Sequence, residues 1–451
     1  MLDKESLNIL REALEKLDAG FAALPEFDAR IPGAEHIAQA LAATAERLQD
    51  NYPYFHPLYA GQMLKPPHPV ARLAYALAQW INPNNHALDG GRATSAMEKE
   101  AVAAIAEMFG WREHLGHLCG GGTMANLEAL WVAGQLAPGK KILASDQAHY
   151  THGRISGVLQ FPFASVPCDS LGRMDLAKLS ELVAPGHVGT VVATMGTTAT
   201  GSVDPLAGIL ELREKHGFRV HADAAYGGYF GLAGNLAEEA RREFDRLHLA
   251  DSIVIDPHKH GLQPYGCGCV VFSDPGVGRL YKHDSPYTYF SSSDLHLGEI
   301  SLECSRPGAA AAALWATQKL LPLEKGGEFA RGLEDGRKAA LDLHQRLEKD
   351  ARFLTAFPPE LDIVVFAPRA ESVSEASNRS RKIFEAAARR NLHLAVAELP
   401  VAFFDANLGG MRRDRKSLTC LRSVLMKPEH KEWVGRIWEI LSEATVECLG
   451  R

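Results

Sequence analysis

The spacing of hydrophobic and polar positions changes several times between residues 111 and 272, and these changes separate predicted strands from predicted helices. Short runs of apolar and β-branched residues, typical of buried strands, occur at 141–144, 190–194, 219–222, 252–255 and 268–272. Segments of helical length lie between them, including 124–135, 174–182 and 206–216. This alternation predicts an α/β fold in which helices cover a mostly parallel sheet. Functional sites in such folds form at the carboxyl ends of the strands.

Helical spacing of apolar residues continues on both sides of this region. Before it, helices are expected over 1–17, 70–80 and 95–109. After it, the expected elements are helices at 308–320, beyond Glu324, at 375–390 and at 431–448, and strands at 361–366 and 418–426. We therefore expect an N-terminal helical arm over 1–75, a large α/β domain over 76–325 and a smaller α+β domain over 326–451.

The composition is that of a globular protein with a slightly acidic balance. Of 451 residues, 48 are Lys or Arg and 55 are Asp or Glu, which gives a net charge of −7. No dense Lys/Arg cluster occurs, and this argues against nucleic acid as the main partner, because binding phosphates needs a basic face. No apolar run is long enough to span a membrane, and residues 1–17 lack the apolar core of a signal peptide. We therefore expect a cytoplasmic protein without a membrane partner.

Seven cysteines are scattered along the chain. Cys267 and Cys269 form a C-x-C pair, but no second pair or histidine cluster completes a zinc site. Buried reduced thiols are therefore expected, and no metal. Cys119, which lies beside a run of glycines, is expected to pack in the core and not to act as a nucleophile.

A glycine-rich turn, Gly120-Gly121-Gly122-Thr123, directly precedes the predicted helix 124–135. Free backbone N–H groups and the positive end of the helix dipole favour an anion such as phosphate there, and the Thr123 hydroxyl adds a donor. The turn lacks both the Gly-Lys-Ser/Thr of a P-loop and the G-x-G-x-x-G dinucleotide spacing. By themselves, three glycines in a row more often form a simple turn than an anion site.

Two further motifs follow predicted strands. Asp223 lies in His-Ala-Asp-Ala-Ala-Tyr-Gly-Gly at 221–228, and Lys259 lies in Asp-Pro-His-Lys-His-Gly at 256–261. The interval between them suits a βαβ unit of ~30 residues. Neighbouring strand ends would then place a carboxylate and an amine across one crevice.

The residues beside these two groups are consistent with a bound aromatic cofactor. Ala225 is small enough for a flat ring to lie close against the backbone. His258 and His260 flank Lys259, and their positive charge or burial would suit a neutral amine, which Schiff-base chemistry needs.

These motifs, in this order, resemble the group II decarboxylases, a family of pyridoxal-phosphate enzymes that act on aromatic amino acids, glutamate, aspartate or tyrosine. The resemblance runs from about residue 51 to the C-terminus and is strongest for archaeal and bacterial tyrosine/aspartate decarboxylase-like members. It implies the aspartate-aminotransferase fold (type I), with a mostly parallel seven-stranded sheet in the large domain. It also implies a homodimer with sites at the interface, in which the arm over 1–75 takes part in dimerisation.

The resemblance also implies roles for individual residues. Lys259 resembles the lysine that forms the Schiff base with pyridoxal phosphate, and Asp223 resembles the aspartate that keeps the pyridine nitrogen protonated. His149 matches the histidine that stacks on the ring and helps in proton transfer, and Ala225 matches the small residue under the ring. Further cofactor contacts are implied for Gly122, Thr123, Thr198, His258 and Ser305, the last of these supplied by the partner subunit.

Three residues are implied in handling the substrate. Arg422 resembles the arginine that grips the α-carboxylate, for which its planar fork is suited, although a surface salt bridge is the simpler interpretation. Gln62 falls on a loop of the substrate pocket. Tyr289, with Tyr287 as the alternative, lies in the serine-rich segment 284–293, where the family keeps a mobile loop with a proton-donating tyrosine. An ordinary surface loop would look the same.

The resemblance therefore implies decarboxylation of an L-amino acid to the amine and CO2. Another pyridoxal-phosphate lyase reaction, an aldehyde-forming reaction on the same fold and a non-catalytic homologue stay open as alternatives. The substrate is not specified by these motifs. Tyr54, Phe55, His56 and Tyr59 offer aromatic surface, which slightly favours an aromatic substrate, although dimer packing would explain them equally well.

Overall fold

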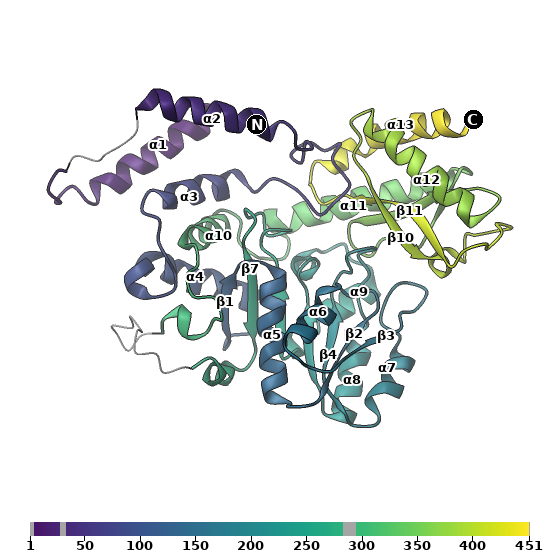
Figure 1. Cartoon of the computed structure of the whole chain (residues 1–451), viewed down its shortest axis with the longest axis horizontal. Helices are drawn as coiled ribbons and strands as arrows, with labels where there is room; N and C mark the ends of the chain where they lie inside the picture. The colour runs from purple at the N-terminus through teal and green to yellow at the C-terminus, as the bar shows by residue number, and fades with distance from the viewer. Residues whose placement is uncertain (1–3, 28–32, 283–294, 451) are drawn as a thin grey trace.

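A seven-stranded sheet with strand order β1-β7-β6-β5-β4-β2-β3 forms the centre of the larger part of the molecule (Figure 1). The computed structural model describes residues 4–27, 33–282 and 295–450. Strands β2 to β6 run parallel to one another, whereas β7 is antiparallel to both β6 and β1. The strands are β1 (Leu115–Cys119), β2 (Lys141–Ser145), β3 (Phe163–Val166), β4 (Val188–Thr194), β5 (Arg219–Asp223), β6 (Ser252–Ile255) and β7 (Gly268–Phe272).

The mostly parallel seven-stranded sheet confirms the predicted fold class. Five strands coincide with predicted runs to within two residues, because each is almost wholly buried and all but β5 consist mainly of apolar or β-branched residues. The sequence prediction missed β1 and β3, the two outermost strands of the sheet. Strand β1 is interrupted by Gly116 and His117, and β3 has only one fully buried residue, so neither shows a continuous apolar run.

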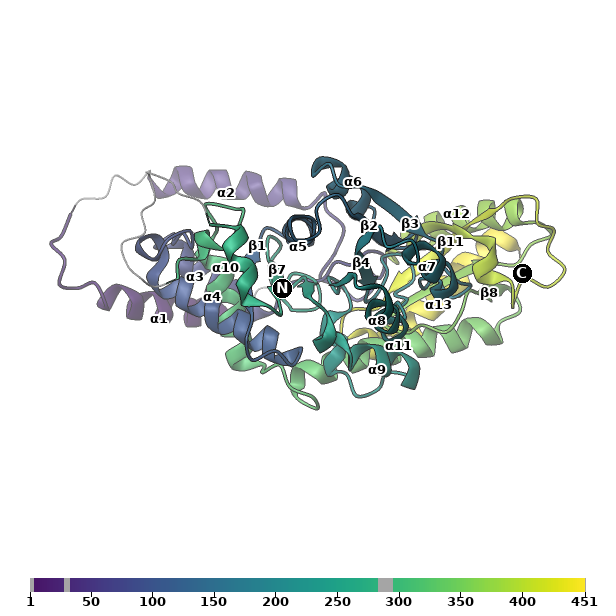
Figure 2. The same ribbon diagram turned by 90° about the horizontal axis from the view of Figure 1, so that it is seen from below.

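Helices cover both faces of this sheet. Figure 2 shows α5 and α6 on one face and α8 and α9 on the other. Helices α3 and α4 pack against α10 beside β1 and β7. The helices of this part are α3 (Pro69–Gln79), α4 (Leu88–Met108), α5 (Gly122–Leu136), α6 (Thr151–Val158), α7 (Leu176–Val183), α8 (Leu206–His216), α9 (Glu238–Phe244) and α10 (Gly308–Leu320).

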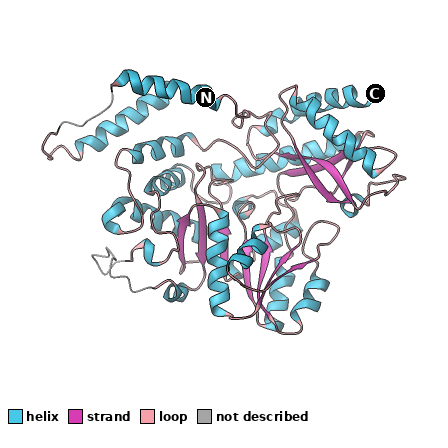
Figure 3. Ribbon diagram, viewed as in Figure 1, coloured by secondary structure: helices cyan, strands magenta, loops and turns pink. Residues whose placement is uncertain are grey.

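A second, antiparallel sheet forms the smaller C-terminal part of the molecule (Figure 3). Its strand order is β10-β11-β9-β8, and α11, α12 and α13 pack on it and on one another. Its elements are α11 (Glu328–Lys349), β8 (Phe353–Thr355), β9 (Ile363–Pro368), α12 (Val373–Ala388), β10 (Ala395–Pro400), β11 (Ser417–Val424) and α13 (His430–Leu449). The short β8 and the alternately exposed β10 were not predicted.

The N-terminal segment contains two helices, α1 (Lys4–Ala19) and α2 (Ala34–Leu48), of which only the first was predicted. Neither helix contains a buried residue. The chain then passes over the small sheet, where the backbone of Ala60 bonds to His393 and Val424. Within the described residues, no helix is long and apolar enough to cross a membrane.

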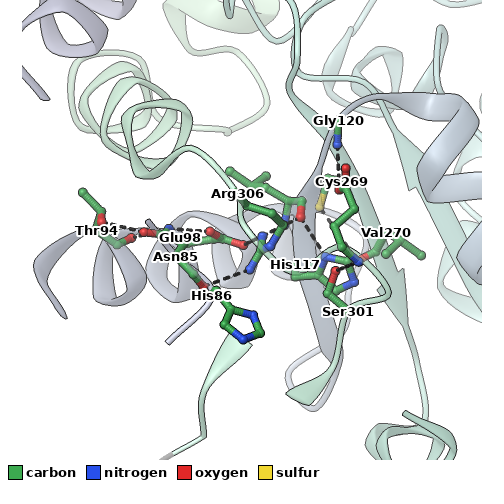
Figure 4. Close-up of polar contacts among 12 residues, drawn as sticks. Asn85, His86, Thr94, Glu98, His117, Gly120, Cys269, Val270, Ser301 and Arg306 are labelled. Atoms are coloured by element: carbon green, nitrogen blue, oxygen red, sulfur yellow. Dashed lines mark hydrogen bonds and ion pairs between the residues drawn. The ribbon is translucent and has the colours of Figure 1, made fainter. Parts of the chain in front are cut away.

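A buried polar network fixes the end of β1, just before the glycine-rich turn (Figure 4). Arg306 donates to the Glu98 carboxylate and, over 2.6 Å, to the carbonyl of Leu118. Glu98 in turn accepts the backbone N–H of Leu118 at 2.9 Å and the side-chain amide of Asn85 at 2.6 Å. Glu98 is 1% and Arg306 5% exposed, so this ion pair is almost fully removed from water.

Replacing Glu98 with Gln is expected to lower the free energy of unfolding by about 3–5 kcal/mol, because it leaves the buried Arg306 charge without its partner. Urea denaturation followed by circular dichroism measures the effect. Arg346→Gln is the control, since that arginine pairs with Asp342 on α11 where both side chains are 38% exposed. The control should cost less than about 1 kcal/mol, and an equal loss in the two variants would contradict a special role for the buried pair.

Candidate active site

The glycine-rich turn connects β1 directly to the N-terminus of α5. Gly121 precedes the helix with φ +144°, a conformation that side chains rarely allow. At Gly122 a Cβ atom would lie 2.6 Å from the Asp256 carboxylate, so this close approach also requires glycine. The first N–H groups of α5 have no partner within the helix, and together with the helix dipole they make this turn a candidate anion site.

Five strand ends meet around one cavity of about 500 Å³. It lies where the turn after β1 meets the segments that follow β2, β4, β5 and β6, at the edge of the sheet that the parallel strands share. The residues that line it are Gly120, Gly121, Gly122, Thr123, Met124, Asn126, Leu127, His149, Thr151, Thr194, Gly196, Thr198, Asp223, Ala225, Tyr226, Asp256, His258, Lys259 and Glu303. The structure thus brings together eight predicted residues: Gly122, Thr123, His149, Thr198, Asp223, Ala225, His258 and Lys259.

Asp223 is the last residue of β5 and is 5% exposed. Burial by itself would raise its pKa, but the hydrogen bond from His152 and the positive charge of Lys259 lower the pKa below its usual value. The carboxylate oxygens accept from His152 Nε2 at 2.8 Å and from the backbone N–H of Ala225 at 3.2 Å. Asp223 therefore presents an ionised, oriented carboxylate to the cavity.

Lys259 lies on the turn after β6, and its Nζ is 3.0 Å from Asp256 Oδ2. The other oxygen of Asp256 is buried without a hydrogen-bond partner among the described residues. The Asp256 carboxylate also lies against the glycine turn at Gly122. It is therefore placed between the Lys259 amine and that turn. The sequence prediction missed Asp256, although its position directly after an apolar strand resembles that of Asp223.

The histidines around the cavity are held in their neutral forms. Burial lowers the pKa of both His149 and His258. His149 Nδ1 lies 2.8 Å from the Thr151 hydroxyl, and His258 Nδ1 donates to the carbonyl of Cys267 over 2.8 Å. Burial also lowers the pKa of His260. The histidines that flank Lys259 therefore do not supply the positive charge that the sequence suggested as one possibility.

Glu303 also reaches the anion site. Its carboxylate accepts the backbone N–H of Gly120 at 2.9 Å and lines the cavity. It lies two residues before Ser305, the residue for which we predicted a phosphate contact. Ser305 itself is exposed, accepts a hydrogen bond from Asn84 at 3.1 Å and does not line the cavity of its own chain.

Arg422 is buried in β11 and does not form the surface salt bridge that was the simpler interpretation. Its guanidinium donates to the carbonyls of Thr198 (2.7 Å), Ala199 (3.1 Å) and Gly61 (3.3 Å) and to Gln62 Oε1 (3.1 Å). Arg422 and Gln62 are therefore in contact, directly behind the cavity-lining Thr198. Tyr287 and Tyr289 lie outside the described residues.

The aromatic residues near the N-terminal arm pack on one another and on the small domain. The Tyr54 and Tyr59 rings meet edge to face at 4.9 Å, and His56 meets Trp433 at 4.9 Å. None of Tyr54, Phe55, His56 and Tyr59 is among the described residues that line the cavity. Within one chain, these side chains therefore pack outside the cavity.

The cavity fits pyridoxal phosphate in each of its chemical features. The start of α5 suits the phosphate, the Asp223 carboxylate suits a protonated pyridine nitrogen, and the Lys259 amine suits the aldehyde. Ala225, a small residue, leaves room for a flat ring in the same cavity. The Asp256 oxygen without a partner adds a further unused polar group.

Comparison with known sequences also points to an enzyme that uses pyridoxal phosphate. Residues 49–369 match the conserved domain of pyridoxal-dependent decarboxylases. The chain is 29% identical over 395 residues to the L-tyrosine decarboxylase of Enterococcus faecium, covering 65% of this chain and 64% of that protein. It is 29% identical over 334 residues to a probable L-tyrosine/L-aspartate decarboxylase of Methanothermobacter thermautotrophicus, covering 72% and 86% of the two chains.

Solved structures show the same fold. Mouse CSAD aligns with a TM-score of 0.79 at 18% identity, over 98% of this chain and 99% of that chain. Oryza sativa TDC with PLP and tryptamine aligns with a TM-score of 0.77 at 19% identity, over 98% and 96%. With the match over residues 49–369, these results establish that the chain belongs to the pyridoxal-dependent decarboxylases, a family of carboxy-lyases that use pyridoxal phosphate.

Proposed function

We propose that this protein removes the α-carboxylate of an L-amino acid as CO2 and releases the corresponding amine, with pyridoxal phosphate bound through Lys259. One observation supports this most strongly: the Lys259 amine and the ionised Asp223 carboxylate line the same cavity as the anion site at the start of α5. The relatives named above suggest L-tyrosine and L-aspartate as the first substrates to test.

The cofactor, when bound, supplies an aromatic ring that accepts the electron pair left when a bond at Cα breaks. The residues of this chain prepare that chemistry. Asp223, whose own pKa is low, would keep a proton on the ring nitrogen of the cofactor. His149, neutral through burial, could accept or return a proton in the cavity that it lines. Gly122, Thr123, Thr198 and His258 would orient the bound group, and the Lys259 amine would hold it covalently between turnovers.

The remaining roles rest on the family resemblance. Tyr289, or Tyr287 in its place, is the proposed proton donor to Cα, and Ser305 is the proposed phosphate contact from the partner subunit. An aldehyde-forming reaction or another lyase reaction is the alternative, and release of aldehyde or ammonia without a stoichiometric amine would favour it. A non-catalytic homologue would show no absorbance change when pyridoxal phosphate is added.

Replacing Lys259 with Ala is expected to abolish the absorbance band of the covalently bound cofactor and to reduce amine formation below detection, with the fold retained. Lys178→Ala is the control, because Lys178 is an exposed lysine on α7 whose partner is Glu181. Spectra with added pyridoxal phosphate, and CO2 and amine release from L-tyrosine, L-aspartate and the other common amino acids, provide the readouts. Turnover by Lys259→Ala at the wild-type rate would contradict the assignment.

The proposed grip of Arg422 on the α-carboxylate can be separated from its structural hydrogen bonds. A charge-assisted hydrogen bond of ~1.5–3 kcal/mol corresponds to about 10–100-fold in affinity. Arg422→Lys is therefore expected to weaken binding of the amino acid by that factor and to leave binding of the amine product, which has no carboxylate, almost unchanged. Spectral titration of the cofactor-loaded variant measures both affinities. Equal weakening of both ligands would indicate that Arg422 only supports the loop at Thr198.

We also propose that the protein is a homodimer in which α1 and α2 contact the partner subunit. These helices bury none of their own residues, and Leu41 and Leu48, one above the other on α2, are 63% and 61% exposed. Single subunits rarely leave such apolar surfaces uncovered.

Replacing both Leu41 and Leu48 with Glu is expected to raise the dimer dissociation constant by roughly 100-fold or more, since each buried leucine contributes ~1.5–3 kcal/mol. The subunit fold should be unaffected because both side chains are exposed within one chain. Sedimentation velocity over a range of concentrations measures the change, with Glu46→Gln on the same helix as the control. A double variant that dimerises like the wild type would exclude α2 from the interface.

A further inference from the structure

A second histidine, His152, lies behind the carboxylate that faces the cavity. It occupies the first turn of α6, three residues after His149, and is 1% exposed. His149 lines the cavity, whereas His152 does not. Instead, His152 Nε2 lies 2.8 Å from Asp223 Oδ2. One short segment after β2 therefore supplies one histidine to the cavity and another to the side chain at its base.

The hydrogen-bond pattern indicates how His152 acts on Asp223. The carboxylate accepts at Nε2, so this nitrogen bears the hydrogen. His152 Nδ1 is buried without a hydrogen-bond partner among the described residues. A second N–H at Nδ1 would be left without an acceptor, at a cost comparable to a lost hydrogen bond. The neutral ring with hydrogen on Nε2 fits both observations, and it orients the carboxylate without cancelling its charge.

The other titratable groups around Asp223 do not duplicate this contact. His221 on the same strand bonds to Asn126 and Ser252, each at 2.8 Å, and burial lowers its pKa to about 3. Lys259 pairs with Asp256, and His149 bonds to the Thr151 hydroxyl. Within the described part of the chain, His152 is the side chain that hydrogen-bonds to Asp223, and the backbone N–H of Ala225 holds the other oxygen.

We infer that His152 is a positioning residue for this enzyme, which acts through Asp223 to hold a carboxylate charged and aimed at the ring nitrogen of bound pyridoxal phosphate. The inference rests on the proposed role of Asp223. Without the hydrogen bond, a buried carboxylate would tend to take up a proton, because burial penalises the charged form. It would then pair less strongly with a protonated ring nitrogen, and the ring would become a poorer acceptor of electrons.

Two variants of His152 test this inference. His152→Phe keeps a ring of similar size and removes the donor, whereas His152→Gln places an amide N–H near the position of Nε2. For His152→Phe we expect cofactor affinity to fall by about 10–100-fold, the range for loss of a hydrogen bond to a charged group. We also expect kcat to fall more than KM changes. His152→Gln should recover most of both properties.

A spectroscopic readout separates this role from general packing. With the cofactor bound through Lys259, its long-wavelength absorbance would report whether the nitrogen shared with Lys259 carries a proton. A ring nitrogen that is less protonated withdraws fewer electrons, so that shared nitrogen should keep its proton to higher pH in His152→Phe. The midpoint should therefore move upward in His152→Phe and return toward the wild-type value in His152→Gln.

The control is His344→Phe, which replaces a buried histidine on α11 away from the cavity. It should leave cofactor affinity and the absorbance midpoint unchanged, even if it lowers the melting temperature. A His152→Phe protein with the affinity, kcat and midpoint of the wild type would overturn the inference, as would a His152→Gln protein that shows the same losses as His152→Phe.

If His152→Phe does not fold, nitrogen NMR of histidine-labelled wild-type protein decides the question, with the His152 signals assigned from the His152→Gln spectrum. The inference requires hydrogen on Nε2 and none on Nδ1, and a shift of the Nε2 signal in Asp223→Asn. The opposite tautomer would overturn it. A protein that binds pyridoxal phosphate but decarboxylates no amino acid would contradict the proposed function and still leave the affinity and absorbance tests of His152 valid.

Discussion

The parallel direction of the central strands is the constraint on which the site depends. Strands β2, β4, β5 and β6 run in the same direction. Strand β1 also runs in this direction, because it is antiparallel to β7, which is itself antiparallel to β6. The carboxyl ends of all five strands therefore lie at one edge of the sheet. Each then needs to contribute only one or two residues from the turn that follows it. The contact between Gly122 and the Asp256 carboxylate sets how closely two of these turns approach.

Much of this arrangement was predictable from local sequence. Long buried strands give continuous apolar runs, and the interval between Asp223 and Lys259 matches one crossover, so their meeting in space could be anticipated. The outer strands β1 and β3 escaped prediction because edge positions and the glycine in β1 interrupt the pattern. His152 was not predicted, because nothing in the local sequence indicates its contact with Asp223, 71 residues further along the chain.

Other features depend on contacts between distant parts of the chain. Arg422 reaches carbonyls at Gly61, Thr198 and Ala199, which lie 361, 224 and 223 residues away, and no local pattern announces such a contact. Two further contacts of this kind were also not predictable from local sequence. The Tyr226 hydroxyl donates to the carboxylate of Asp362, which belongs to the small domain, and His260 lies 3.3 Å from the same carboxylate. The aromatic cluster at Tyr54 and Tyr59 was similarly ambiguous until its packing on the small domain was known. Such contacts join the two sheets directly behind the cavity.

The Glu98–Arg306 pair has a consequence for the order in which this protein acquires its structure. The two residues are 208 positions apart, and their contact supports the strand that leads into the anion-binding turn. Contacts of such long sequence separation form late, because the entropy of closing the intervening chain must be overcome first. During synthesis, residues 115–119 leave the ribosome well before both their strand partner β7 and the arginine that anchors their end. The end of β1 therefore gains this support only after residue 306 has been synthesised.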